Sequence, residues 1–205
     1  QTIDIDGNTQ LVSGGIAVAE SNGDDYIKDI IPTPDGNYLI FWVEEIWPAS
    51  RLKYNKIDQS GNTTIGWPPN GYSLSNQSFE ANNVSVKKIS DVAGVLAVWN
   101  QDGNFSDVYA QKINWDGVVQ WQDFGVPVSI ADNDQSAISF DIDASGSYAF
   151  IAWEDYRNGN DYNVLGKEIE TYRSKTFNKD EFFYDYEKKS IKDKRKMGHL
   201  TVLKK

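Results

Sequence analysis

The stretch IAWEDYRNGNDYN, residues 151–163, decides the fold. In it an apolar run ends in a tryptophan, Trp153, which is followed by an acidic pair and a polar turn that contains glycine. This order predicts a β-strand, a tight loop and the start of a returning strand. Related stretches occur upstream around Trp42 and Trp99. The chain therefore contains a repeated unit, of which residues 151–163 are the clearest copy.

The repeat has a period near 55 residues and divides the body of the chain into units at about 1–56, 57–112 and 113–162. A repeat of this length determines the fold class. Three kinds of glycine keep the same order in every unit: one in a turn after an apolar strand, one before alternating apolar residues, and one before the run that ends in tryptophan. The three sets are Gly7, Gly61 and Gly117, then Gly15, Gly71 and Gly125, then Gly36, Gly94 and Gly146.

Each unit has room for four short strands, and none shows the 3.6-residue apolar period of a helix. We therefore predict an all-β fold of three four-stranded propeller-like blades, an incomplete propeller, followed by a short β-rich tail. In such blades the recurring tryptophan fills the space between neighbours. An open sandwich or a stacked β-array built from the same units remains an alternative. Three blades cannot close a ring, so the open apolar faces predict self-association.

Composition restricts the partners and leaves the compartment open. Residues 1–162 carry 23 Asp and Glu against eight Lys and Arg, whereas residues 163–205 carry seven against 12. An acidic body argues against nucleic acid, whose phosphates are bound by clusters of Lys and Arg. No apolar run is long enough to span a bilayer, and the absence of cysteine excludes disulfides and thiolate sites. Gln1 aligns with Gln111, inside a unit, so we expect a fragment of a longer array.

Three stretches resemble a family of bacterial secreted repeat proteins whose repeats read roughly W-x-D-x-R-x-G-x-x-D-I-Y-A-Q-x-I-D-x-x-G. They are WEDYRNGNDYN at residues 153–163, SDVYAQKINWDG at 106–117 and FGVPVS at 124–129. Those repeats are usually assigned to β-propellers of exported or cell-surface proteins. The resemblance covers residues 1–162 and implies an extracellular or cell-surface scaffold, or a binding surface for a protein or glycan. The family has no common activity, so the resemblance implies no catalytic residue and no cofactor.

Residues 163–205 lose this pattern. RKMGHLTV at residues 195–202 resembles the carboxyl-terminal signature of the ATP-grasp enzyme carboxyaminoimidazole ribonucleotide synthase of purine synthesis, and NVLG at 163–166 resembles a strand of that family. The resemblance implies that Arg195 and Lys196 lie near a nucleotide substrate. We recognise no substrate domain or ATP-grasp central domain, so we expect no such catalysis by this chain. ATP, magnesium and a cytoplasmic location are implied only for a full-length enzyme.

Several residues are of types found in catalytic or metal-binding sites, but we favour a structural role for them. The runs that begin at Asp4 and Asp141 alternate oxygen side chains as calcium loops do, but tight turns need the same residues, and the distal glutamate is missing. The acidic pairs at residues 44–45 and 154–155 recur with the repeat, which favours a structural role, with Asp155 pairing with Arg157, over glycoside hydrolysis. His199 is the only histidine, so the sequence offers no Ser-His-Asp triad in the body. We predict no catalytic and no metal-binding residue.

The sequence thus favours a non-catalytic fragment of an exported β-propeller repeat protein. The alternative is a purine-synthesis ATP-grasp ligase represented only by its last segment. Charge, aromatic type and repeat pattern all change near Asn163, since all seven tryptophans lie before it. This joint change motivates the hypothesis that two genes meet there, as a chimera, and one uninterrupted product amplified across codons 155–170 of the source DNA would overturn it.

Overall fold

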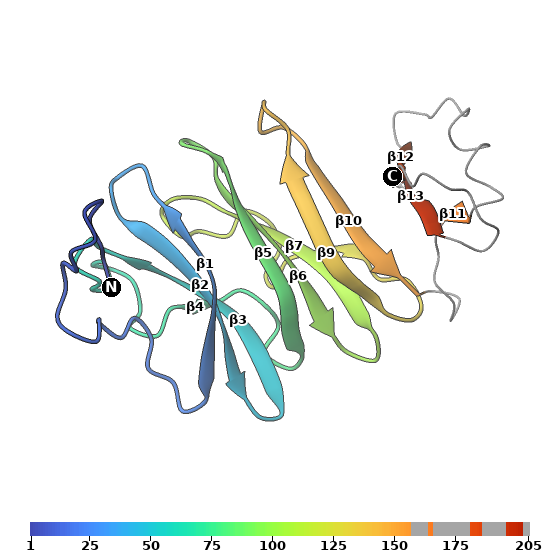
Figure 1. Cartoon of the computed structure of the whole chain (residues 1–205). Helices are drawn as coiled ribbons and strands as arrows, with labels where there is room; N and C mark the ends of the chain where they lie inside the picture. Colours follow the sequence, from blue (N-terminus) through green and yellow to red (C-terminus); the bar gives the residue numbers. More distant parts are fainter. Residues whose placement is uncertain (157–163, 166–180, 186–195, 203–205) are drawn as a thin grey trace.

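The fold is all-β, as the sequence predicts. The structure is a computed structural model that describes residues 1–156, 164–165, 181–185 and 196–202. Two four-stranded antiparallel sheets and one two-stranded sheet stack one after another in chain order (Figure 1). No helix in the described part of the chain is long and apolar enough to cross a membrane.

The first two sheets are simple meanders in which consecutive strands are neighbours. The first sheet contains β1 (Asp24–Pro32), β2 (Tyr38–Ile46), β3 (Ala49–Ile57) and β4 (Tyr72–Ser73). The second contains β5 (Glu80–Ser90), β6 (Gly94–Asp102), β7 (Ser106–Ile113) and β8 (Val126–Ser129), and the third pairs β9 (Gln135–Ile142) with β10 (Ala149–Asp155). The starts of the sheets, at residues 24, 80 and 135, preserve the predicted period.

Two details of the predicted blades differ from the structure. The expected ends of the repeat units, at residues 56 and 112, fall at the ends of β3 and β7 instead of between sheets. The unit boundaries differ from the sheet boundaries because the turn glycines that define the repeat, Gly61 and Gly117, follow the third strand of a sheet. The third blade was expected to have four strands, but the described residues supply two, and residues 157–163 lie outside them.

A turn held by one polar side chain follows the third strand of the first and second sheets. Asp58 Oδ1 accepts hydrogen bonds from the backbone N–H groups of Ser60 (2.8 Å) and Asn62 (2.9 Å). Asn114 and Asp4 make the same two bonds in their own turns. A short side-chain oxygen that caps its own turn explains these positions. The Asp4 carboxylate is thus used as the turn interpretation predicts.

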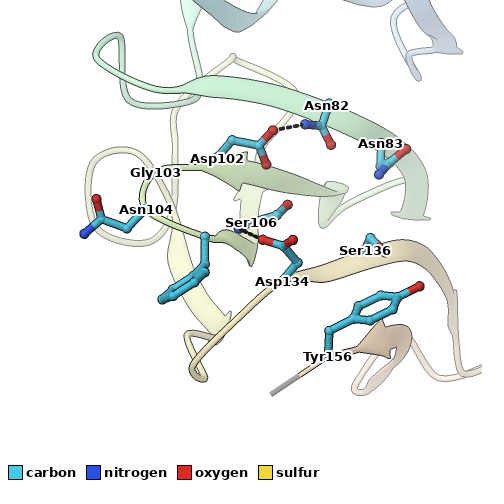
Figure 2. Close-up of a pocket in the computed structure, with 10 residues that line it drawn as sticks. Asn82, Asn83, Asp102, Gly103, Asn104, Ser106, Asp134, Ser136 and Tyr156 are labelled. Carbon is cyan, nitrogen blue, oxygen red and sulfur yellow. Dashed lines mark hydrogen bonds between the residues drawn. The ribbon is translucent and has the colours of Figure 1, made fainter. Parts of the chain in front are cut away.

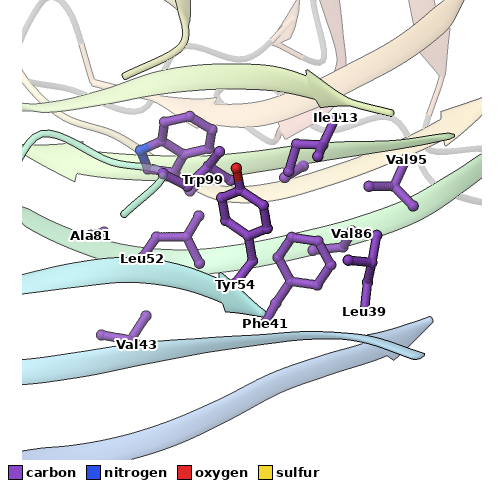
Figure 3. Packing of buried hydrophobic residues seen from close by; sticks show 12 residues of the cluster. Leu39, Phe41, Val43, Leu52, Tyr54, Ala81, Val86, Val95, Trp99 and Ile113 are labelled. Carbon is purple, nitrogen blue, oxygen red and sulfur yellow. The ribbon is translucent and has the colours of Figure 1, made fainter. Parts of the chain in front are cut away.

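The largest cluster of buried apolar side chains lies between the first and second sheets (Figure 3). Phe41, Leu52 and Tyr54 of the first sheet face Trp99 of β6, which is completely buried. Burial of each such side chain stabilises the fold by roughly 1.5–3 kcal/mol. The Tyr54 hydroxyl also donates a hydrogen bond to the carbonyl of Gly117 (2.9 Å). Burial raises the pKa of Tyr54 to about 12, so this donor keeps its proton at neutral pH.

A second cluster joins the second and third sheets. Leu96 and Val98 of β6 and Val108 of β7 pack against Phe140 of β9. Because side chains alternate along a strand, β6 presents Trp99 to the first sheet and Leu96 and Val98 to the third. Strand β6 is therefore buried on both faces, which explains its almost continuous apolar sequence.

The tail contributes a small antiparallel sheet, in agreement with the predicted β-rich tail. Its strands are β11 (Val164–Leu165), β12 (Glu181–Asp185) and β13 (Lys196–Val202), in the order β11-β13-β12. Strand β12 lies between the other two in the sequence, and its residues EFFYD include aromatic side chains, which favour strands.

Two equivalent glycines admit the short outer strands beside the buried tryptophans. Gly71 precedes β4 and Gly125 precedes β8, and both have positive φ, at 64° and 87°. A Cβ added to Gly71 would lie 2.5 Å from the Trp42 ring, and one on Gly125 would lie 2.5 Å from the Trp99 ring. Only glycine allows this approach of backbone to indole.

We predict that Gly125→Ala lowers the free energy of unfolding by about 2–4 kcal/mol, because it adds a clash with Trp99 to the strain of a positive φ. Gly66→Ala is the matched control: φ is 90° there, but nothing lies within 4 Å of the added Cβ. It should cost only about 1 kcal/mol. Denaturant unfolding of both variants measures the difference, and equal losses would contradict the packing described.

Candidate functional site

A cavity of about 580 Å³ lies where one end of the second sheet meets the third sheet (Figure 2). Its wall is formed by the start of β5, the β6–β7 hairpin and residues beside β9 and β10. Amide, carboxylate and hydroxyl groups line it together with two aromatic rings. The side chains that matter most below are Asn82, Asn83, Asp102, Phe105, Asp134 and Tyr156.

Two hydrogen bonds fix the carboxylates of the cavity. Asn82 Nδ2 donates to Asp102 Oδ2 (2.7 Å), which joins β5 to the end of β6. The backbone N–H of Ser106 donates to Asp134 Oδ1 (3.0 Å), which ties the β6–β7 hairpin to the segment before β9. Asp102 Oδ1 is buried and has no hydrogen-bond partner among the described residues. This oxygen is shielded from solvent, so the missing hydrogen bond costs stability and does not offer a contact to a ligand.

A chain of amides behind the wall holds the second and third sheets together. Asn83 Nδ2 donates to Asn100 Oδ1 (3.0 Å), and Asn100 Nδ2 donates to the carbonyl of Gln135 (2.6 Å). Asn100 is completely buried, so these bonds replace the water that its amide would otherwise bind. Asn83 has a positive φ of 45°, a conformation that asparagine tolerates better than most residues. The cavity is therefore shaped by the same bonds that join the two sheets.

The electrostatic environment of the cavity is negative. Burial raises the pKa of the neighbouring Asp107, and the charges of Asp102 and Asp134 raise it further. Among the described residues that line the cavity there is no Lys, Arg or His. An anionic ligand would meet these carboxylates without a compensating cation, so the cavity is better suited to neutral or cationic groups.

Two aromatic side chains stand at the margin of the cavity. Phe105 is at the tip of the β6–β7 hairpin and is partly exposed. Tyr156 follows β10, and its hydroxyl donates to Glu154 Oε2 (2.9 Å). Aromatic rings beside polar groups can take an apolar ligand face while the polar groups hold its hydroxyls.

A smaller cavity of about 410 Å³ lies between the first and second sheets, but the lysine that lines it is already paired. Lys56 Nζ lies 2.7 Å from Asp35 Oδ2 and also donates to the carbonyl of Trp115 (3.1 Å). The hydrogen bond from Lys56 holds the pKa of Asp35 well below its usual range. The ion pair lies within the first sheet, the hydrogen bond from Lys56 to Trp115 links that sheet to the second, and together they leave fewer groups for a ligand.

The recurring acidic residues serve their own sheets, as the sequence analysis predicts. Glu44 is buried, and its carboxylate lies 3.2 Å from Lys53 Nζ and 3.7 Å from Arg51 Nη1. Lys53 also lies over the Trp42 ring, 5.8 Å from its centroid. Asp155, the equivalent of Glu44, accepts a hydrogen bond from the indole nitrogen two residues earlier (3.2 Å). The expected partner Arg157 lies outside the described residues.

The calcium-like run after Asp141 is also a turn. Asp143 accepts hydrogen bonds from the backbone N–H groups of Ser147 (2.9 Å) and Tyr148 (2.7 Å), and these bonds lower its pKa together with one from Ser145. Asp141 lies 2.9 Å from Lys87 Nζ on β5. Within the described ranges, no group of three or more His, Cys, Asp or Glu residues could hold a metal ion.

The residues predicted from the tail are only partly described. Arg195 lies outside the described residues, and Lys196 is the first residue of β13. His199 lies on the same strand, opposite Tyr184 of β12. The structure therefore places Lys196 and His199 on one strand and leaves their predicted roles as predictions.

Sequence reasoning missed the cavity itself. Its residues come from four separate segments, 82–83, 102–106, 134–136 and 156, and only the fold brings them together. One signal was available: pairs of polar residues, Asn82–Asn83 and Asn133–Asp134, stand near the start of a strand in two of the units.

Comparison with known proteins bears on the tail alone. Residues 162–205 match a family model described as the phosphoribosylaminoimidazole carboxylase C-terminal domain. This is the enzyme type that the tail was predicted to resemble. The match covers about a fifth of the chain, so it characterises a segment and not the whole protein. No curated protein and no solved structure matches the chain significantly.

Proposed function

We propose that residues 1–156 belong to a non-catalytic scaffold of the β-propeller repeat type, exported and displayed at the cell surface, whose cavity between the second and third sheets binds a glycan. The observation that carries the proposal is the composition of the cavity wall: amides and carboxylates beside two aromatic rings, with no basic side chain among the lining residues that the structure describes. The stacked four-stranded meanders supply the scaffold.

A neutral sugar matches the groups that the cavity offers. Each sugar hydroxyl both donates and accepts hydrogen bonds, so it can donate to the exposed carboxylate of Asp134 and exchange bonds with an amide such as Asn82. The apolar face of a sugar ring can lie against Phe105 or Tyr156. A volume of about 580 Å³ falls in the usual range for small-molecule sites.

The acidic groups favour binding over hydrolysis. A glycosidase needs one carboxylate as an acid and a second as a nucleophile or base on opposite sides of the scissile bond. Asp102 and Asp134 are instead held by hydrogen bonds in the wall, and Glu44 and Asp155 serve their own sheets.

We predict that Phe105→Ala weakens binding of a neutral oligosaccharide about five- to tenfold, because a stacked ring contributes about 1 kcal/mol. A glycan array read with labelled full-length protein identifies the sugar, and calorimetry with that sugar measures the affinity. Phe124→Ala is the matched control, since Phe124 is exposed to the same extent as Phe105 but does not line the cavity. No binding on the array, or equal losses in both variants, would contradict the proposal.

A second candidate rests on the family match of residues 162–205. In this alternative the chain represents the carboxyl-terminal part of a cytoplasmic purine-synthesis ligase that uses ATP and magnesium, with Arg195 and Lys196 near the nucleotide substrate. If the body and the tail derive from different genes, the chain can contain both the repeats and the segment that matches this family.

An assay with aminoimidazole ribonucleotide, bicarbonate and ATP separates the two candidates. We expect no product above background, because the sheets of residues 1–156 show none of the features that would bind ATP. The Lys196→Ala variant serves as the control for any signal. Turnover that depends on both ATP and Lys196 would reverse the order of the two candidates.

A further inference from the structure

Four asparagines of the chain stand in the pattern Asn-x-Ser/Thr, in which the side-chain amide of an exported protein can receive an N-linked glycan. They are Asn62, Asn76, Asn83 and Asn104. Bacterial oligosaccharyltransferases also select an acidic residue two positions before the asparagine. Only Asn104 meets this condition, because Asp102 precedes it in the pentapeptide DGNFS, residues 102–106. The sequence therefore distinguishes Asn104 from the other three.

Asn104 lies at the tip of the β6–β7 hairpin. Asp102 pairs with Ser106 at the base of the tip, and the backbone N–H of Gly103 donates to the carbonyl of Phe105 (2.9 Å). Asn104 is exposed, and its side chain forms no hydrogen bond with the described residues. Figure 2 shows its amide directed away from the other labelled side chains. A sugar on Asn104 Nδ2 would therefore extend into solvent and leave the hairpin intact.

The other three asparagines are less suited to carry a glycan. Asn83 Nδ2 donates to Oδ1 of the buried Asn100 (3.0 Å), so a sugar on that nitrogen would crowd this bond. Asn62 Nδ2 donates to Asp58 Oδ2 (3.4 Å) within its own turn. Asn76 is half-buried. The fold thus favours the same asparagine as the sequence.

We infer that Asn104 receives an N-linked glycan from a polyprenyl-diphosphate-linked oligosaccharide. In the transfer, Asn104 Nδ2 attacks C1 of the first sugar and forms a C–N bond. The bond between C1 and the diphosphate oxygen breaks, the polyprenyl diphosphate leaves with the electron pair, and the amide proton passes to a base of the transferase. The inference rests on the export included in the proposed function, and not on the ligand of the cavity.

The structure also indicates when the transfer takes place. In the folded protein, Asn82 Nδ2 donates to Asp102 Oδ2 (2.7 Å), and Asp102 Oδ1 is buried. A transferase that binds this carboxylate must therefore reach it before β5 and β6 have paired. Transfer accompanies folding after export, and the finished hairpin then displays the glycan at its tip.

Export of the full chain in a bacterial host tests the site, with an added export signal, a bacterial oligosaccharyltransferase and its lipid-linked oligosaccharide. The mass of the purified protein should increase by one oligosaccharide, and peptide mapping should place the increase on Asn104. Ser106→Ala should abolish the increase, and Ser106→Thr, which keeps the hydroxyl, should retain it. Ser78→Ala is the matched control, because it removes only the pattern at Asn76 and should leave the glycan on Asn104.

A copy of DGNFS added after Lys205 shows that the transferase is active on this pentapeptide. An unmodified Asn104 beside a modified copy, or a glycan mapped to Asn62, Asn76 or Asn83 in place of Asn104, overturns the inference. Because the experiment supplies the export signal, these results concern the site alone. Finding the native protein only inside its own cells would instead contradict the proposed function.

Discussion

The burial of strand β6 on both faces is the constraint on which the rest of the structure depends. Trp99 fills the space toward the first sheet, while Leu96 and Val98 fill the space toward the third. A strand in this position has no face left for water, so a polar side chain in its middle, such as that of Asn100, is stabilised by partners within the protein. Gly125 has no side chain, so its backbone can lie against the Trp99 ring. The first and the third sheet both pack against β6.

The candidate site is a consequence of that burial. Asn100 is a polar residue on the buried strand, and its amide finds its partners in Asn83 and in the carbonyl of Gln135. Those two bonds bring the start of β5 and the start of β9 together. The cavity opens where the apolar packing ends, because Asp102 and the hairpin after it must remain near solvent.

Much of the fold could be predicted from the sequence, because glycine positions and alternating apolar residues are local signals. The recurrence of Trp42, Trp99 and Trp153 predicted the stacking of similar sheets, and the structure confirms an all-β chain. The cavity could not be predicted, since its residues converge only through sheet packing. Strand β12 was missed because charged neighbours mask its short aromatic run. The predicted role of Arg195 came from resemblance, and the family match supports that resemblance for the tail alone.

The middle strands should be the most stable part of the molecule, and amide hydrogen exchange measures local stability strand by strand. We expect the amides of β2 and β6, which are paired on both sides, to exchange slowest, and those of the edge strand β1 to exchange at least tenfold faster. Exchange in β6 as fast as in β1, or uniform exchange across the first two sheets, would contradict the central place of that strand.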